Sequence, residues 1–310
     1  MLNVLFSAKP KAWDAYQTPL NAAFAEAGLD VHLARDHPPT ATDYIVFAPN
    51  GPVTDFAPYT NTKAVLSLWA GVETVVDNPS LTQPLCRLVD TSLTRGMVEW
   101  VTGHCLRHHL GMDAHINGQD GVWRDHISPP LASARPVTIL GIGALGAACG
   151  QALTALGFPV TGWSRSAKNV SGLRCLHGDD GLVQALTGAQ IVILLLPQTP
   201  ATTDILNADR LAMLAPGAFI INPGRGPLID DHALLQALDS GQVAHATLDV
   251  FRVEPLPDDH PFWAHPRVTV TPHIAATTRP ETAAQIIVDN IKRGEAGQPF
   301  LNVVDRGLGY

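Results

Sequence analysis

Three residues that lie far apart in the chain have side chains suited to chemistry on a carbonyl group: Arg225, Glu254 and His273. Each follows an apolar run that predicts a β-strand, over residues 218–221, 246–250 and 268–271, respectively. Open α/β sheets bind ligands at the carboxyl ends of their strands, so we expect the three side chains at that edge. A guanidinium binds a carboxylate, an imidazole transfers a proton, and a carboxylate orients the imidazole. The set fits carbonyl reduction, for which a nicotinamide supplies the hydride, or the reverse alcohol oxidation, in which the nicotinamide accepts it.

A nucleotide-binding pattern precedes these residues. A short apolar run that predicts a strand leads into Gly141, Gly143 and Gly146, and a helical pattern follows. The first glycine permits a tight turn, the second lets the backbone approach a pyrophosphate, and the third lets the helix pack against the strand. The pyrophosphate would face the start of the helix, at Ala144 and Leu145, where unpaired N–H groups favour an anion.

The turn after the next strand indicates which dinucleotide is bound. Ser164 stands where NAD enzymes place an acidic residue for the ribose 2′-hydroxyl. Arg165, Ser166 and Lys168 follow, so two cations and two hydroxyls gather where a 2′-phosphate would lie. Because a guanidinium pairs with phosphate through two N–H donors, the turn predicts NADPH over NADH. A solvated basic turn is the alternative interpretation.

Each of the three chemical residues also has a purely structural interpretation. Arg225 could cap a strand end, Glu254 could be a surface turn residue beside Pro255, and His273 could be a satisfied core histidine. All three fall at strand ends behind a nucleotide-binding fold, and this joint placement favours function over the three structural interpretations.

Composition predicts a two-domain enzyme of the cytoplasm. The chain has 310 residues, 46% of them hydrophobic, and exceeds what one core usually supports. A formal net charge of −8 without basic runs argues against a nucleic-acid partner. The strongest apolar run, residues 191–196, is far too short to span a membrane, and the amino terminus lacks a basic leader. Four cysteines without metal or redox spacing suggest reduced thiols, and we expect no metal.

Strand and helix patterns alternate along the whole chain, which favours an α/β fold. We expect two Rossmann-like or flavodoxin-like domains with parallel sheets, the substrate domain being discontinuous. It would comprise residues 1–96 plus 278–310, and residues 97–277 would form the dinucleotide-binding domain. The expected strands are residues 4–6, 31–33, 44–47 and 64–68 in the first domain, and 137–140, 158–163, 191–196, 219–222, 247–251 and 268–271 in the second. Helices are expected near residues 12–27, 97–110 and 280–292.

Several motifs resemble the D-isomer-specific 2-hydroxyacid dehydrogenases, and most of all their glyoxylate/hydroxypyruvate reductase A branch. They are the glycine loop, Trp-Ser-Arg-Ser at 163–166, Leu-Pro at 196–197, Leu-Asp-Val-Phe at 248–251, Glu-Pro-Leu-Pro at 254–257, Thr-Pro-His-Ile-Ala-Ala at 271–276, Val-Asp-Arg at 304–306 and the closing Gly309 and Tyr310. The resemblance covers nearly the whole chain, and the Trp-Ser-Arg-Ser turn and the ending are typical of that branch.

The resemblance implies a role for each substrate-site residue. Backbone N–H groups around Ala70, Gly71 and Val72 would bind the substrate carboxylate. Arg225 would bridge that carboxylate and the carbonyl oxygen, and polarise the carbonyl. His273 would donate a proton to the oxygen.

The remaining implied roles orient the ring and hold the cofactor. Glu254 would hold the other ring nitrogen of the histidine and favour its charged form. Asp249 would meet the nicotinamide carboxamide, and Leu196 and Pro197 would also contact the cofactor. The family's usual Gly-Ala-Gly-Val-Asp loop begins here with Trp69, which could narrow the pocket or extend it for an aromatic acid.

The expected function is NADPH-dependent reduction of small 2-oxo acids, glyoxylate and hydroxypyruvate first, to 2-hydroxy acids. Reduction of bulkier acids such as phenylpyruvate, and a non-catalytic NAD(H)-binding module like the family's corepressors, are the alternatives. Similar enzymes imply a homodimer through residues 97–130, where Trp100, Val101 and Trp123 fit a partner surface.

A second histidine group lies in the same region. His104 and His108 are spaced for one helical face, and His109 adjoins them. A metal site is the less favoured interpretation, because no acidic residue or cysteine completes a ligand set nearby. We expect these histidines on a helix that faces the partner subunit.

Overall fold

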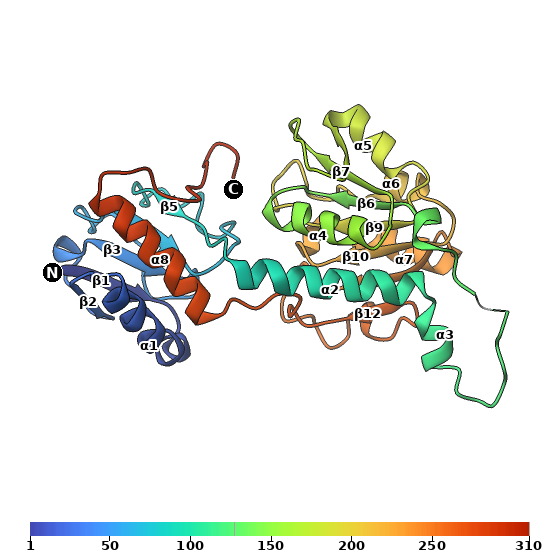
Figure 1. Cartoon of the computed structure of the whole chain (residues 1–310), viewed down its shortest axis with the longest axis horizontal. Helices are drawn as coiled ribbons and strands as arrows, with labels where there is room; N and C mark the ends of the chain where they lie inside the picture. Colours follow the sequence, from blue (N-terminus) through green and yellow to red (C-terminus); the bar gives the residue numbers. More distant parts are fainter. Residues whose placement is uncertain (127, 310) are drawn as a thin grey trace. The chain divides into compact units, whose positions relative to one another are not determined.

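The computed structural model describes residues 1–126 and 128–309, so Ile127 of the expected dimer segment and the closing Tyr310 lie outside the described residues. The chain divides into two compact units. Unit 1 comprises residues 1–93 and the segment from residue 277 to the carboxyl end, and unit 2 comprises residues 94–276. Figure 1 shows that each unit is built on its own sheet.

Unit 1 is a five-stranded parallel sheet in the order β2-β1-β3-β4-β5. Its strands are β1 (Leu2–Ser7), β2 (Val31–Ala34), β3 (Tyr44–Phe47), β4 (Ala64–Ser67) and β5 (Leu85–Cys86). One face is covered by α1 (Pro10–Glu26) and α8 (Pro280–Glu295), whose apolar sides share a core with Val4, Val46 and Leu66. The other face is covered by residues of the loops between β3 and β5, among them Phe56 and Leu81.

The sequence accounts for α1 and α8 directly. Both helices begin with proline at their first turn, where the missing N–H costs no hydrogen bond. In α8, Ala283, Ala284, Ile287, Val288 and Ile291 follow helical spacing and are all buried. Two helices that are more than 200 residues apart in the chain, α1 and α8, therefore cover the same face of this sheet.

Unit 2 is a seven-stranded parallel sheet in the order β12-β11-β10-β9-β6-β7-β8. Its strands are β6 (Val137–Leu140), β7 (Val160–Ser164), β8 (Arg174–His177), β9 (Ile191–Leu194), β10 (Ala218–Asn222), β11 (Val243–Leu248) and β12 (Val268–Val270). The helices α2 (Thr91–His109) and α4 (Ala144–Ala155) share the core of one face, and α5 (Gly178–Leu186), α6 (Ala208–Ala212) and α7 (Asp231–Ser240) that of the other. A short helix α3 (Met112–Ile116) follows α2.

Two parallel α/β sheets confirm the expected fold class, but the expected strands and helices need correction. The strands β5 and β8 were not expected, because β5 is two residues long and β8 lies at a sheet edge with its two ends exposed. Helix α2 begins at Thr91 rather than near Met97. The buried Asp90 explains the earlier start, since its carboxylate accepts from the Leu93 N–H at 2.6 Å, as a cap residue does.

Candidate active site

His273 and Glu254 form a hydrogen-bonded pair in unit 2. Glu254 lies in the loop after β11 and His273 in the loop after the neighbouring strand β12, which pairs with β11 in parallel. The ring Nδ1 is 2.7 Å from Glu254 Oε2, and Glu254 Oε1 accepts from the Phe251 N–H at 2.9 Å. The His273 side chain is 55% exposed, so its Nε2 edge is available to a ligand. An oriented imidazole of this kind can exchange a proton with a bound substrate.

The backbone around His273 is held in an unusual conformation. His273 has φ +54°, a left-handed geometry that bulky residues avoid. The buried Asp249 at the end of β11 stabilises it: its carbonyl accepts from the His273 N–H at 2.8 Å, and its carboxylate accepts from the Ile274 and Ala275 N–H groups at 2.9 Å each. The Thr271 hydroxyl adds a fourth bond at 2.6 Å. Strain of this kind persists where the surroundings fix it, and it is typical of functional sites.

Arg225 is placed at the same sheet edge, after β10, the strand next to β11. Its loop is shaped by Asn222, 1% exposed, whose amide donates to the Arg225 carbonyl at 2.9 Å and accepts from the Gly224 N–H at 3.1 Å. A Cβ at Gly226 would lie 2.0 Å from the Phe251 carbonyl carbon. The Arg225 loop thus passes directly against the loop that carries Glu254, and only glycine admits this approach.

The glycine loop between β6 and α4 has the geometry of a pyrophosphate site. Gly141 has φ +103°, and a Cβ there would strike the Leu195 carbonyl at 2.6 Å. A Cβ at Gly146 would lie 1.9 Å from the Gly141 oxygen, so the helix packs as closely as the fingerprint requires. A Cβ at Gly143 would meet no other described atom within 4 Å. The second glycine faces open space at the amino end of α4, as an incoming phosphate needs.

The turn after β7 carries the residues expected at the adenosine ribose. Ser164 is 6% exposed, and its hydroxyl donates to the Ser166 carbonyl at 2.8 Å. Ser164 thus shapes the turn, while Arg165, Ser166 and Lys168 are exposed. Leu196 is buried and Pro197 half-buried in the segment after β9, the strand beside β6. The residues expected to bind the cofactor therefore lie at the carboxyl ends of β6, β7 and β9, apart from Asp249, which follows β11.

The loop expected to bind a carboxylate lies in unit 1, after β4. The buried Ser67 holds Trp69: its hydroxyl accepts from the Trp69 N–H at 3.0 Å and donates to the Trp69 carbonyl at 3.1 Å. Within the part of the chain that the structure describes, the N–H groups of Ala70, Gly71 and Val72 donate to no protein acceptor. Successive N–H groups left in this state form an anion-binding concavity. The Trp69 indole is 42% exposed.

Comparison with known proteins identifies the family. The sequence model of the D-isomer specific 2-hydroxyacid dehydrogenase NAD binding domain matches residues 102–275. The chain belongs to this family. Glyoxylate/hydroxypyruvate reductase A of Serratia proteamaculans is 44% identical over 256 residues, 80% of this chain and 82% of the relative. The corresponding reductase of Yersinia enterocolitica is 41% identical over 256 residues, with the same coverage of each chain.

Solved structures agree along the full length. A D-isomer specific 2-hydroxyacid dehydrogenase from Xanthobacter autotrophicus, in complex with NADPH and MES, superposes with a TM-score of 0.93 at 41% identity and covers 100% of this chain and 99% of its own. An NADPH-dependent glyoxylate/hydroxypyruvate reductase from Sinorhizobium meliloti, in complex with NADP and sulfate, gives a TM-score of 0.87 at 35% identity with full coverage of both chains. The chain is thus an NAD(P)-dependent dehydrogenase whose similarity lies with the glyoxylate/hydroxypyruvate reductase A branch.

His108 and His109 of α2 belong to the interior of this dehydrogenase, which corrects the expectation that they face a partner, whereas His104 is half-buried against Trp100. His108 is 4% exposed, stacks on Phe219 of β10 with ring centroids 4.8 Å apart, and places Nε2 2.9 Å from the Thr247 hydroxyl. His109 is 5% exposed and packs edge-on against the Phe158 ring. Val101 is fully buried in the same core and also does not face a partner. Among residues 1–126 and 128–309, no group of three His, Cys, Asp or Glu residues is arranged to hold a metal ion.

The sequence motifs do not indicate the polar residues that support the candidate site. No motif singles out Asn222 or Ser67, and the hydrogen bonds that Asp249 makes to the His273 loop were not expected. All three are polar yet 2% exposed or less. A polar residue at the last position of an apolar strand was the available signal, because such a side chain needs a buried partner.

Proposed function

We propose that the protein reduces small 2-oxo acids, glyoxylate and hydroxypyruvate first, to the 2-hydroxy acids, with NADPH as the hydride source. The observation that carries the proposal is the His273–Glu254 pair at 2.7 Å, set beside Arg225 at one sheet edge. When bound, the cofactor supplies the hydride that reaches the carbonyl carbon. The protein supplies orientation, charge and the proton.

In this proposal His273 is the proton donor. Its Nδ1 is engaged by Glu254, so Nε2 is the nitrogen that donates to the carbonyl oxygen as the carbon accepts hydride. The Glu254 carboxylate stabilises the imidazolium that precedes transfer and fixes the ring plane. In the oxidation direction the neutral ring accepts the proton from the hydroxyl.

The substrate carboxylate would bind to the N–H groups of Ala70, Gly71 and Val72, and Arg225 would bridge the carboxylate and the carbonyl oxygen. A guanidinium presents paired donors in a fixed plane, so it can hold the acid group and stabilise negative charge on the oxygen. Asp249 is committed to the His273 loop through both carboxylate oxygens, and contact with the nicotinamide carboxamide is a further role that we propose for it.

NADPH is proposed over NADH because of the turn after β7. No carboxylate stands at Ser164 to repel a 2′-phosphate, and Arg165, Ser166 and Lys168 are exposed beside it. Three relatives whose structures cover this chain in full were solved with NADPH or NADP. The glycine loop, Leu196 and Pro197 would hold the rest of the cofactor.

The test is a panel of glyoxylate, hydroxypyruvate and phenylpyruvate, each assayed with NADPH and with NADH by the loss of absorbance of the reduced cofactor. We expect the highest kcat/KM for the two small acids with NADPH. Preference for phenylpyruvate would replace the substrate proposal and implicate the exposed Trp69 indole, which a Trp69→Gly variant would then check. Binding of cofactor without turnover of any acid would support a non-catalytic module.

We also propose a cytoplasmic homodimer that forms through residues 97–130. The described part of this segment exposes large apolar side chains: Ile116 at 64%, Val122 at 61% and Trp123 at 88%. Exposed apolar groups that gather in one segment mark an interaction site. The dimer of a Trp123→Ser variant should dissociate at a higher protein concentration than the wild-type dimer, as sedimentation velocity measures it.

The cytoplasm is proposed because the four free cysteines agree with a reducing compartment. Separately, none of the described helices is long and apolar enough to cross a bilayer.

A further inference from the structure

The loop that carries Glu254 is fastened by an arginine two residues before it. The Arg252 guanidinium donates to the Asp204 carboxylate and to the Ile229 carbonyl, and its Nε lies 3.6 Å from Asp231 Oδ1. These partners belong to the segment after β9, the link into α7 and the first turn of α7. One side chain thereby ties the Glu254 loop to two stretches of the chain, the segment after β9 and residues 229–231 at the start of α7.

The same carboxylate also reaches the far side of the loop. Asp231 Oδ2 lies 3.9 Å from Nε2 of His260, six residues after Glu254. Burial raises the pKa of Asp231, and Arg252 and His260 oppose this shift. Arg252 and His260, which precede and follow Glu254 in the chain, thus both approach the Asp231 carboxylate. Glu254 therefore lies on a segment anchored at both ends by one residue of α7.

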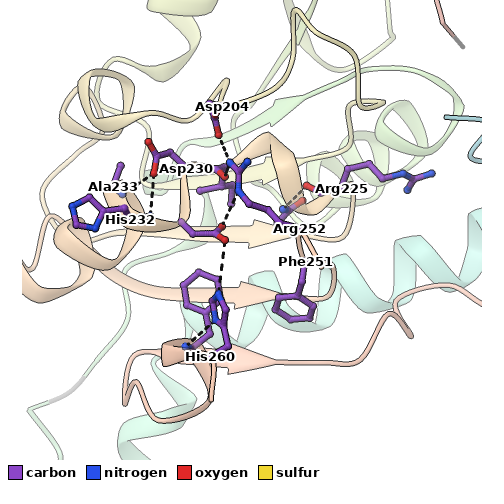
Figure 2. Close-up of polar contacts among 12 residues, drawn as sticks. Asp204, Arg225, Asp230, His232, Ala233, Phe251, Arg252 and His260 are labelled. Atoms are coloured by element: carbon purple, nitrogen blue, oxygen red, sulfur yellow. Dashed lines mark hydrogen bonds and ion pairs between the residues drawn. The ribbon is translucent and has the colours of Figure 1, made fainter. Parts of the chain in front are cut away.

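Arg252 does not act on the substrate in this arrangement. Figure 2 shows its side chain directed towards Asp204 and away from the Arg225 side chain. Its Nη2 donates to two protein acceptors, and Asp204 itself has φ +52°, so both ends of that contact are constrained. The three-way contact suits a planar guanidinium, which offers five donors in a fixed geometry.

We infer that Arg252 and Asp231 form a clamp that positions Glu254 against Nδ1 of His273. The inference rests on the proposed role of the pair in proton transfer and assigns it two positioning residues. Glu254 must meet the Phe251 N–H and the ring at the same time, at 2.9 and 2.7 Å, and a shift of the loop breaks one of these bonds. With the clamp released, the carboxylate no longer selects the tautomer that keeps hydrogen on Nδ1.

The first measurement is independent of turnover. Histidine-labelled protein is compared by ¹⁵N NMR at alkaline pH, with the His273 signals assigned from a His273→Gln variant. In the wild type the neutral His273 ring should carry its hydrogen on Nδ1, and in Arg252→Gln the Nε2–H form should become the major one. Arg252→Lys keeps the positive charge but lacks the planar guanidinium, so its fraction of the Nδ1–H tautomer should lie between those of the wild type and Arg252→Gln. An Arg252→Gln spectrum with the wild-type tautomer overturns the clamp.

The second measurement is a double-mutant cycle on the reduction. Arg252→Gln should lower kcat roughly 10- to 100-fold, the range expected for a misplacement near 1 Å, with KM for NADPH unchanged. Arg252→Gln combined with Glu254→Gln should be no slower than Glu254→Gln alone. Fully additive losses would overturn the inference, because Arg252 would then act by another route.

Controls separate this inference from general damage and from the proposed function. Arg107, whose Nε donates to Asp113 Oδ1 at 2.8 Å, belongs to the same unit but neither to the Glu254 loop nor to the segments that anchor it, so Arg107→Gln should leave the tautomer unchanged. If Arg252→Gln fails to fold, the isosteric Asp231→Asn should shift the tautomer in the same direction, and an unchanged tautomer there overturns the clamp. A wild-type protein that reduces no 2-oxo acid defeats the proposed function, and the NMR comparison still decides the clamp.

Discussion

The carboxyl edge of the unit 2 sheet is built differently in two places: at the ends of β10, β11 and β12, the proposed catalytic edge, and at the ends of β6 and β7, the proposed cofactor edge. At the catalytic edge, polar side chains position the proposed reactive residues: Glu254 contacts the His273 ring, and Asn222 bonds the backbone of the Arg225 loop. At the ends of β6 and β7, the glycine backbone offers the binding geometry, and the side chains at the ribose position are exposed. One edge is an interlocked polar network, and the other is an open backbone cradle.

The difference fits the ligand that we propose for each edge. Proton and hydride transfer demand placement within a fraction of an ångström, so the reactive groups need a rigid second layer of support. A phosphate dianion is large and highly charged, and flexible cations reach it from many positions. We therefore expect substitutions at the catalytic edge to lower kcat and substitutions at the cofactor edge to raise KM.

The largest effect should come from removal of the proton donor. His273→Gln should lower kcat for 2-oxo acid reduction about 10³-fold, within the usual range for general acid catalysis, and leave NADPH affinity within about twofold. Steady-state kinetics and fluorescence titration of the cofactor measure the two quantities. The matched control is His115→Gln, an exposed histidine of α3, which should retain wild-type rates. A His273→Gln enzyme with wild-type kcat would contradict the mechanism.

The contrast between a local backbone pattern and a network of side chains from different strands also explains what could be predicted from the sequence. The glycine loop and the polar residues at strand ends are local patterns, so the fold class was predictable from spacing, and so was the placement of Arg225, Glu254 and His273 after three neighbouring strands. The support around His273 was not, because Asp249 reaches it only once two strands pair in register. The burial of Val101 and His108 was also missed, since a single helix pattern does not say which face meets a sheet.

A substitution at the cofactor edge should separate the two cofactors. Arg165→Ser removes one charge-assisted contact to a 2′-phosphate, worth roughly 1.5 to 3 kcal/mol, and should lower kcat/KM for NADPH about 10- to 100-fold. The value for NADH, which lacks this phosphate, should stay within a factor of about two. Lys292→Ser, an exposed lysine of unit 1, is the control for loss of charge alone. Equal losses with both cofactors would show that Arg165 does not read the phosphate.

The buried His108 of α2, which packs against β10 and β11, should make the stability of unit 2 depend on pH. Burial, followed by the nearby His245, Arg107 and His104, lowers the pKa of His108 from 6.5 to about 2. The unfolded chain takes up this proton near pH 6.5 and the folded chain does not, so the stabilisation is complete above pH 6.5 and is lost as pH falls below it.

At pH 5 this linkage amounts to about 2 kcal/mol for His108. His108→Gln, which can still bond the Thr247 hydroxyl, should therefore show a smaller loss of unfolding free energy between pH 7.5 and 5 than the wild type, by about 2 kcal/mol. Urea titrations at the two pH values measure it. The control is His232→Gln, an exposed histidine that bonds Gln236 on α7 and should keep the wild-type pH dependence of stability. If the stability of His108→Gln depends on pH as the wild type does, the prediction for His108 is wrong.

The smallest expected effect concerns the loop from Trp69 to Val72, which combines a polar side-chain support with backbone N–H donors. The loop from Trp69 to Val72 offers backbone N–H groups, as the glycine loop does, but the buried Ser67 hydroxyl holds its first peptide. Ser67→Ala removes these two bonds, at about 1 kcal/mol, and should raise KM for glyoxylate roughly fivefold with little change in kcat. Ser80→Ala is the matched control, because that hydroxyl also accepts a backbone N–H, from Phe56, but lies outside the loop. If Ser67→Ala lowers kcat instead of raising KM, the loop belongs with the interlocked catalytic edge rather than with the backbone cradle.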